Sequence, residues 1–259
     1  LLLAGKINWH APFWMIVGFS VIVAVIIYIY MKPVTGHLVL EKKSDKNLEI
    51  TGYIKGFTKG KLYIQKIKDT TLVALDTITI NGDSHFTSNI NIQSPEMLYL
   101  FIDRGVSNSI DNNLLFFAEP GKINIETSLT YFTSDAKITG SKNHELYEEY
   151  KYVAARYVDK DLNLLSKKFK AYKDNNQALV DKINQQQQDV LKSKYLYATN
   201  FAVNHSDYEV APYLALSEIY DINMKYLDTI DKSMTPSVAK SNYGQKLKKM
   251  IQERKSSEK

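Results

Sequence analysis

The chain has 259 residues, of which 44% are hydrophobic and 24% are charged, a composition that excludes wholesale disorder. The formal net charge is +5, and lysines and acidic residues are mixed along the chain rather than gathered in a basic stripe, which argues against a nucleic-acid-binding protein. The sequence contains no cysteine, and this excludes disulfides, thiolate metal sites and thiol nucleophiles.

Residues 12–31 form a run of twenty residues without a charge, PFWMIVGFSVIVAVIIYIYM. A helix of this length spans roughly 30 Å, the thickness of the hydrocarbon core of a bilayer. The run is longer than the apolar part of a cleaved signal peptide, and aromatic residues stand near both of its ends. We therefore expect a transmembrane helix in contact with the lipid bilayer. The residues expected to mark the membrane span are Pro12, Trp14, Tyr28, Tyr30 and Met31.

From Leu48 to about Thr139 the pattern is typical of short strands that alternate in polarity between turns. The step Asn81-Gly82-Asp83 predicts a hairpin, because Asn-Gly accepts the positive φ angles of a tight turn. A second hairpin is expected in LLFFAEPGKINIE, where Glu119-Pro120-Gly121 would turn the chain and Glu119 would be a turn residue. A further turn is expected at Lys59-Gly60, and the last strand-like segment, AKITG, is expected to end at Gly140. The pattern predicts a small antiparallel β-sandwich or open barrel.

After Ser141 the chain reads as helical. Apolar residues recur at helical intervals in SKNHELYEEYKYVAARYVDKDLNLLSKKFKAY, with Asn143 as the expected N-cap. A second helix is expected from about Asn176, a third after a capping box at Ser206–Glu209, and a last one with Thr235 as cap and Pro236 in the first position. Their tyrosines could pack in a core or against a partner protein.

Four segments in order, ITGYIKGFTKGKLYIQK, LDTITINGDSHFTSN, LFFAEPGKINIE and ITGSKNHELYEEY, resemble a β-rich domain of unknown function. That domain precedes the thioredoxin-like module in envelope thiol-disulfide oxidoreductases of Bacteroidota. The helical residues from 143 to about 255 are similar to the helices that link the two parts. The thioredoxin module itself is absent from this sequence, so the resemblance carries over no redox residue.

The resemblance implies a periplasmic location, whereas the lysines after residue 31 would by the positive-inside rule place the C-terminal part in the cytoplasm. We expect a single-pass inner-membrane protein whose soluble part lies in the periplasm.

No catalytic, cofactor-binding or metal-binding residue is expected. The five histidines include no pair at the i, i+4 spacing that places two metal ligands on one helix face. No Gly-x-Ser-x-Gly or phosphate-binding loop is present, and the acidic residues of YEEY and DKDL fit a solvated helix face.

The predicted fold class is α+β, with a transmembrane helix, a small antiparallel sandwich and a C-terminal helical region. The expected segments are a tail (1–11), the membrane helix (12–31), a linker (32–47), the sandwich (48–140), the helical region (141–255) and a second tail (256–259). We expect a non-catalytic accessory or scaffold subunit that contacts membrane or envelope proteins. The alternatives are a binding module for a peptide, glycan or lipid and, third, an enzyme or partner-dependent redox component.

Overall fold

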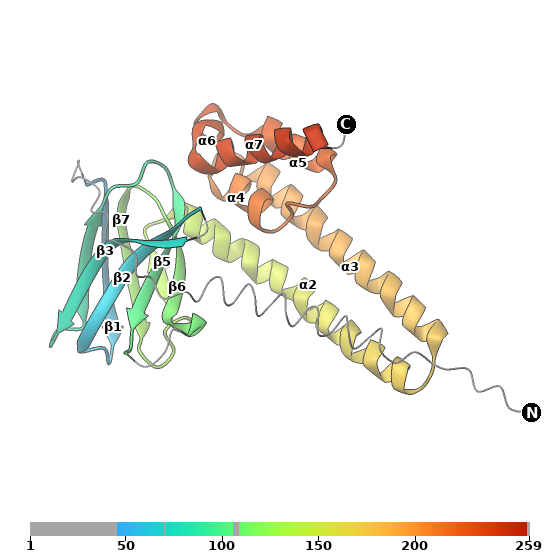
Figure 1. Cartoon of the computed structure of the whole chain (residues 1–259), viewed down its shortest axis with the longest axis horizontal. Coiled ribbons are helices and arrows are strands. Elements are labelled where there is room, and N and C mark those ends of the chain that lie inside the picture. Colours follow the sequence, from blue (N-terminus) through green and yellow to red (C-terminus); the bar gives the residue numbers. More distant parts are fainter. Residues whose placement is uncertain (1–45, 70, 106–108, 258–259) are drawn as a thin grey trace, which may run out of the picture.

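The computed structural model describes residues 46–69, 71–105 and 109–257. In this part of the chain the strands come first and the long helices follow, so the protein is α+β. Figure 1 shows the strands gathered at one end of the molecule, with two long helices, α2 and α3, extending away from them. The short C-terminal helices lie beside the end of this helical hairpin that is nearer to the strands (Figure 1).

The strands form two four-stranded sheets. The first sheet has the order β4-β1-β7-β8, with bounds His85–Ile90, Leu48–Lys55, Gly121–Ser128 and Lys137–Thr139. The second sheet has the order β3-β2-β5-β6, with bounds Thr71–Asn81, Lys59–Lys68, Glu96–Asp103 and Asn113–Ala118. A short 3₁₀ helix, Ile110–Asn112, leads into β6.

The two sheets pack face to face because each strand turns alternate apolar residues inward. Leu48, Ile50 and Ile54 of β1 are buried in one core together with Leu62 and Ile64 of β2. Gly52 interrupts the apolar row of β1 for a steric reason, since a Cβ there would overlap the carbonyl oxygen of Ile125 and the ring of Phe86. The β1 backbone therefore lies against its neighbours more closely than a side chain would allow.

The fold class predicted from the sequence needs two corrections. The sandwich is not purely antiparallel, because β1 and β7 pair in parallel, with Leu48 opposite Gly121. The predicted fold also included a membrane-spanning helix, but none of the helices in the described part of the chain is both long and apolar enough to cross a bilayer. Residues 12–31, on which that prediction rests, lie outside the described residues.

Both predicted hairpins are wrong, because the strands on either side of each turn belong to different sheets. The chain leaves β3 at Asn81 in the second sheet and enters β4 in the first sheet, although Gly82 does adopt a positive φ of 95°. Likewise β6 ends at Ala118 in the second sheet and β7 begins at Gly121 in the first. The positive φ predicted for the Asn81-Gly82 turn is confirmed at Gly82, but local sequence does not specify which sheet the next strand joins. Similarly, the turn expected at Lys59-Gly60 is part of β2, and the chain turns just before it.

The helices are α2 (Lys142–Lys173), α3 (Gln177–Asn204), α4 (Val210–Ser217), α5 (Met224–Ser233), α6 (Pro236–Lys240) and α7 (Asn242–Ser257). α2 and α3 form an antiparallel pair whose outer half is held by a small apolar cluster. That cluster consists of Leu164, Ala171, Val180, Ile183 and Val190.

A larger helical core joins this pair to α4–α7 and to the outer face of the second sheet. Met97 of β5 and Phe117 of β6 are buried in it. The ring of Phe117 packs edge-on against Tyr213, and the hydroxyl of Tyr243 accepts a hydrogen bond of 2.9 Å from the Met97 backbone N–H. Tyr150 is buried in the same core and Tyr147 packs against it, whereas Tyr152 and Tyr172 of α2 are exposed.

Several predicted helix starts also need correction. Ser141, and not Asn143, caps α2, because its side chain accepts a hydrogen bond from the His144 backbone N–H. The capping box expected at Ser206–Glu209 is not formed, and α4 has no side-chain cap of its own. Thr235 and Pro236 do begin a helix as predicted. That helix ends at Lys240, and α7 starts anew at Asn242.

Candidate binding groove

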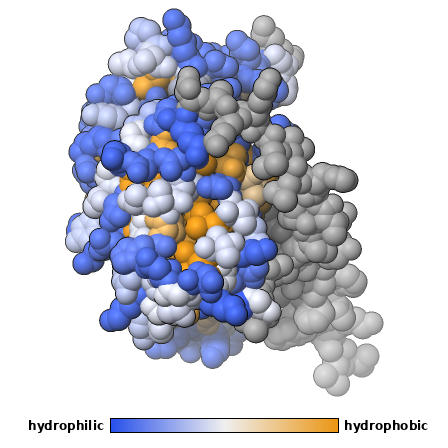
Figure 2. Space-filling view, turned by 90° about the vertical axis from the view of Figure 1, so that its left-hand side faces the viewer, coloured by the Kyte–Doolittle hydropathy of each residue, from blue (hydrophilic) through white to orange (hydrophobic). Residues whose placement is uncertain are grey.

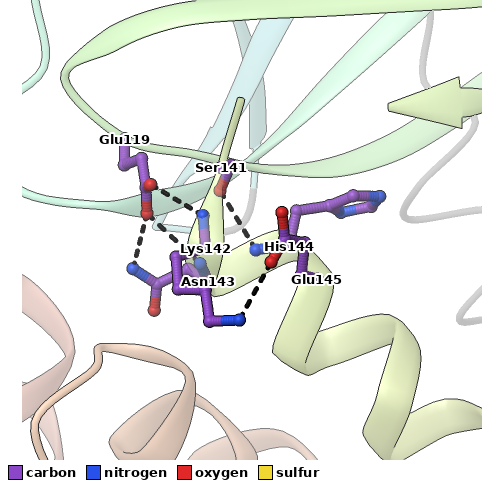
Figure 3. Close-up of polar contacts among 6 residues, drawn as sticks. All are labelled: Glu119, Ser141, Lys142, Asn143, His144 and Glu145. Atoms are coloured by element: carbon purple, nitrogen blue, oxygen red, sulfur yellow. Dashed lines mark hydrogen bonds and ion pairs between the residues drawn. The ribbon is translucent and has the colours of Figure 1, made fainter. Parts of the chain in front are cut away.

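The first turn of α2 is fixed to the sandwich by a cluster of polar contacts around Glu119, which follows β6. Its carboxylate accepts hydrogen bonds from the backbone N–H of Lys142 at 2.7 Å and of Asn143 at 3.2 Å, and from Asn143 Nδ2 at 2.8 Å. Figure 3 shows these contacts beside the Ser141 cap. A carboxylate at a helix N-terminus satisfies unpaired N–H groups and interacts favourably with the helix dipole. Glu119, expected as a turn residue, therefore sets where α2 starts.

Asn143 extends this cluster to α4. Its side-chain oxygen accepts a hydrogen bond of 2.8 Å from the Val210 backbone N–H, so it caps the helix that lacks a cap of its own. Its Nδ2 also lies 3.2 Å from a carboxylate oxygen of Glu209. Burial raises the pKa of Glu209, and the nearby charge of Glu119 raises it further. One buried asparagine thus links β6, α2 and α4.

Next to this cluster lies a groove of about 680 Å³, between the outer edges of β6 and β8 and the first turns of α2. Its volume falls within the ~300–1,000 Å³ range of ligand sites. β6 and β8 are the last strands of their sheets, and each is paired on one side only within the described residues. The groove is lined by Asn113–Leu115, by Thr133, Ser134 and Ala136–Thr139, and by His144, Tyr147, Glu148 and Lys151.

His144 is hydrogen-bonded to one end of the edge of β6 that no other described strand pairs with. The backbone N–H of Phe117 donates a hydrogen bond of 3.4 Å to its Nδ1, which requires an unprotonated nitrogen there. Its Nε2 lies 3.6 Å from the carboxylate of Glu148. Burial lowers the pKa of His144, in spite of the opposing influence of Glu148, so the ring is neutral at pH 7. A neutral, hydrogen-bonded histidine is a structural group here.

The next outward-facing residues of β6 are Leu115 and Asn113. Backbone groups alternate in direction along a strand, so the N–H and C=O of Leu115 point the same way as the N–H of Phe117, away from β5. The side-chain oxygen of Asn113 is buried and has no hydrogen-bond partner in the described part of the protein. Such an acceptor is destabilising by about 1–3 kcal/mol unless a donor reaches it.

The rim of the groove is charged on the helix side. Glu148 and Lys151 of α2 form an ion pair of 2.7 Å, with both side chains about half exposed, and Lys137 lines the opposite wall. Leu115 and Ile138 supply apolar surface between them. Among the described residues, the groove offers main-chain hydrogen bonds, the unsatisfied acceptor of Asn113 and a mixed surface, and no hydrogen bond between a nucleophile and a base is formed in it.

Other parts of the described surface show weaker evidence of a binding site. No group of three or more histidine or acidic side chains in the described residues is arranged to hold a metal ion. A smaller hollow of about 370 Å³ lies between β5 and α7, beside Tyr99 and Tyr243. Figure 2 shows that the sandwich end of the molecule is mainly hydrophilic, with a small hydrophobic patch near its middle. Isolated patches of this kind are ordinary on folded proteins.

The residues expected to mark the membrane span, Pro12, Trp14, Tyr28, Tyr30 and Met31, lie outside the described residues. The sequence did not indicate the groove, because its walls come from β6, β8 and α2, which meet only in the folded chain. In the sequence, His144 is one of five scattered histidines without the spacing of metal ligands, and no local pattern marks it as a buried structural group. Asn113 could have been noticed only as a polar residue entering an apolar strand, which is a weak signal.

Comparison with known proteins supports the β-rich part of the expected resemblance. No curated protein matches the chain, and no solved structure does so either. Residues 48–147, which comprise both sheets and the first residues of α2, match the family described as "Domain of unknown function (DUF4369)".

Proposed function

We propose that the protein is a non-catalytic accessory protein that holds a partner by binding an extended peptide segment of it in the groove between β6 and β8. The observation that carries this proposal is the edge of β6 at Leu115, next to the side-chain oxygen of Asn113; within the described residues neither of them has a hydrogen-bonding partner. An added strand pairs with such an edge through its main chain, and the groove walls then select its side chains.

A peptide fits the groove better than a lipid or a glycan does. A lipid chain would leave the Asn113 oxygen and the Leu115 main-chain groups without partners, whereas a peptide N–H and C=O match them in kind. A glycan would use stacked aromatic rings, and among the described residues that line the groove Tyr147 is the only tyrosine, phenylalanine or tryptophan. The Glu148–Lys151 pair and Lys137 would contact the flanking side chains of the peptide.

The proposed location is the cell envelope, with the folded part in the periplasm and the partner a membrane or envelope protein. This part of the proposal is supported by the resemblance to the β-rich domain of Bacteroidota envelope proteins. Its test is protease treatment of cells whose outer membrane is opened and whose inner membrane is sealed. Digestion of residues 46–259 is expected, and full protection would contradict the periplasmic location.

Peptide binding can be tested with a library of unstructured octapeptides and matched variants at one position. Leu115→Pro removes the outward N–H but leaves the pairing with β5, because that N–H does not face β5. Leu115→Ala removes the side chain and keeps the N–H. We expect peptides selected on the native protein to bind Leu115→Pro at least about tenfold more weakly, because a main-chain hydrogen bond is lost. Leu115→Ala is expected to retain most of the binding.

A second variant separates binding from stability. Asn113→Leu removes the unsatisfied oxygen, so it is expected to leave the free energy of unfolding unchanged or raised while peptide binding weakens. Protection of the Leu115 amide from hydrogen exchange on peptide addition would locate the peptide at this edge. Equal affinity of the native protein and a folded Leu115→Pro variant would refute strand addition, and so would the failure of every library member to bind.

A further inference from the structure

The outer half of α2 carries a row of large apolar side chains that the rest of the described protein does not cover. Val158, Leu162, Phe169 and Tyr172 are 47%, 56%, 59% and 51% exposed, and the partly buried Leu165 lies between them. The steps between these five residues are four, three, four and three, which places them on one face of the helix. We call them the α2 stripe.

The α2 stripe is distinct from the seam between α2 and α3. Leu164 and Ala171, which bind α2 to α3, are buried, and at 3.6 residues per turn they lie about a quarter turn away from the stripe. Figure 1 shows that the outer part of the hairpin extends away from both sheets. Apolar side chains that are scattered singly need no explanation, but a continuous row on a projecting helix is a feature of interaction surfaces.

Charged residues flank the stripe in a definite order. On the side away from α3, the exposed Asp159 lies near the first end of the stripe, and the exposed Lys170 and Lys173 lie near the last end. On the side facing α3, Asp161 comes first and Lys168 follows. Both of these contact Gln187 of α3, through hydrogen bonds of 2.9 Å and 3.3 Å. The stripe therefore runs from an acidic end to a basic end along both of its sides.

We propose that the α2 stripe is the interface of a homodimer, in which α2 of one copy packs antiparallel against α2 of a second copy. The stripe is symmetric about Leu165, with apolar residues three or four and then seven positions away on either side, so an antiparallel copy places Val158 opposite Tyr172. The same two-fold axis brings the acidic end of each copy next to the basic end of the other on both sides. A parallel arrangement would instead place like charges together.

The size of the stripe sets the expected affinity. Its five residues extend over about 21 Å of helix, and an interface formed by one helix face lies at the lower end of the areas found in specific complexes. We therefore expect a dimer that dissociates in the micromolar range. This inference does not depend on the proposed function, because the groove and the stripe are different surfaces.

The test is sedimentation equilibrium of the full chain in a non-ionic detergent, over a range of protein concentrations. Phe169→Ser and Tyr172→Ser are each expected to weaken the dimer at least about 30-fold, because each change removes two anchors per dimer. Tyr152→Ser is the matched control, since Tyr152 is 69% exposed on the same helix but lies outside the stripe. It is expected to change the dissociation constant less than about threefold. Circular dichroism confirms that each variant is folded.

Charge reversal tests the antiparallel arrangement itself. Asp159→Lys places lysine opposite lysine in its own homodimer, and the double variant Lys170→Glu/Lys173→Glu places acid opposite acid. A mixture of the two chains restores opposite charges at both ends, so the mixed dimer is expected to be several-fold tighter than either homodimer. The proposal is overturned if the native chain stays monomeric up to high micromolar concentrations, if Phe169→Ser dimerises as well as the native chain, or if mixing gives no preference for the mixed dimer.

Discussion

Removal of Glu119, which contacts the first turn of α2, should destabilise the protein more than removal of Glu145, an exposed acidic residue within that turn. In Glu119→Ala the N–H groups of Lys142 and Asn143 and the side-chain amide of Asn143 all lose an acceptor. The Lys142 N–H is exposed and can bind water, so the loss of its hydrogen bond to Glu119 destabilises the protein little. Asn143 is buried, and its N–H is left unsatisfied, whereas its Nδ2 retains Glu209.

The expected loss of stability in Glu119→Ala follows from these three hydrogen bonds. A buried donor left without a partner is destabilising by about 1–3 kcal/mol, and the loss of a cap in a helix typically by ~1 kcal/mol. We therefore expect Glu119→Ala to lower the free energy of unfolding by about 3 kcal/mol. Glu119→Gln keeps one acceptor oxygen but turns an NH₂ group toward other donors, so about 1.5 kcal/mol is expected.

The matched control is Glu145→Gln, which removes one negative charge from the same helical turn. Glu145 is exposed and pairs with Lys142 Nζ at 2.9 Å, and an ion pair between two exposed side chains contributes little to stability. Urea unfolding at 25 °C, followed by circular dichroism and fluorescence, gives the free energies. If Glu119→Ala is no less stable than Glu145→Gln, the assignment of Glu119 as the residue that holds α2 against the sandwich is wrong.

Two further predictions follow from the buried positions around this junction. In the folded protein the pKa of Glu209 lies above its ordinary value of 4.5. Between the ordinary pKa and the raised pKa, the folded state therefore binds more protons than the unfolded state. The free energy of unfolding falls as the pH rises through this range. Glu209→Gln should flatten this dependence in urea titrations from pH 4 to 7 (a range chosen about the ordinary value), and an unchanged pH profile would contradict it. Gly52→Ala should lower stability by about 3 kcal/mol through overlap with Ile125 and Phe86, whereas Gly82→Ala, which has open space around it, should lose only ~1 kcal/mol to backbone strain. Thermal melts that rank the two glycine variants in the opposite order would show that the β1–β7 approach is not tight.

The sequence allowed the elements to be predicted where local chemistry determines them. Alternation in β1 and β7 and the Thr235-Pro236 helix start are local patterns, and the structure confirms them. The pairing of strands could not be predicted in this way. Asn81-Gly82 and Pro120-Gly121 both permit a turn, but whether the next strand joins the same sheet depends on how residues such as Ile90 and Ile125 pack across the sandwich.

The groove could not be predicted from the sequence for a related reason. Its informative feature is the edge of β6 that no other described strand pairs with, and the edge position of a strand is fixed by the order of the whole sheet. The polarity of Asn113 and the burial of His144 acquire meaning only once α2 is placed across that edge. The α2 stripe, by contrast, is a row of apolar residues at helical spacing that can be read directly from the sequence. Its helical spacing is shared by core-facing residues, and only the exposure of these side chains in the folded protein shows that the stripe faces outward.

The cluster around Asn143 connects the two proposed surfaces mechanically. Glu119 fixes the first turn of α2 to the end of β6, and Asn143 fixes the same turn to the start of α4. The wall of the groove formed by His144 and Glu148 belongs to this turn and the next one, and the stripe begins on the same continuous helix at Val158. Because a straight helix transmits the orientation of its first turn, a displacement at the cap would move both the groove wall and the outer part of the hairpin. Peptide affinity and dimer affinity should therefore both fall in Glu119→Ala, whereas Phe169→Ser should affect the dimer and leave the groove intact.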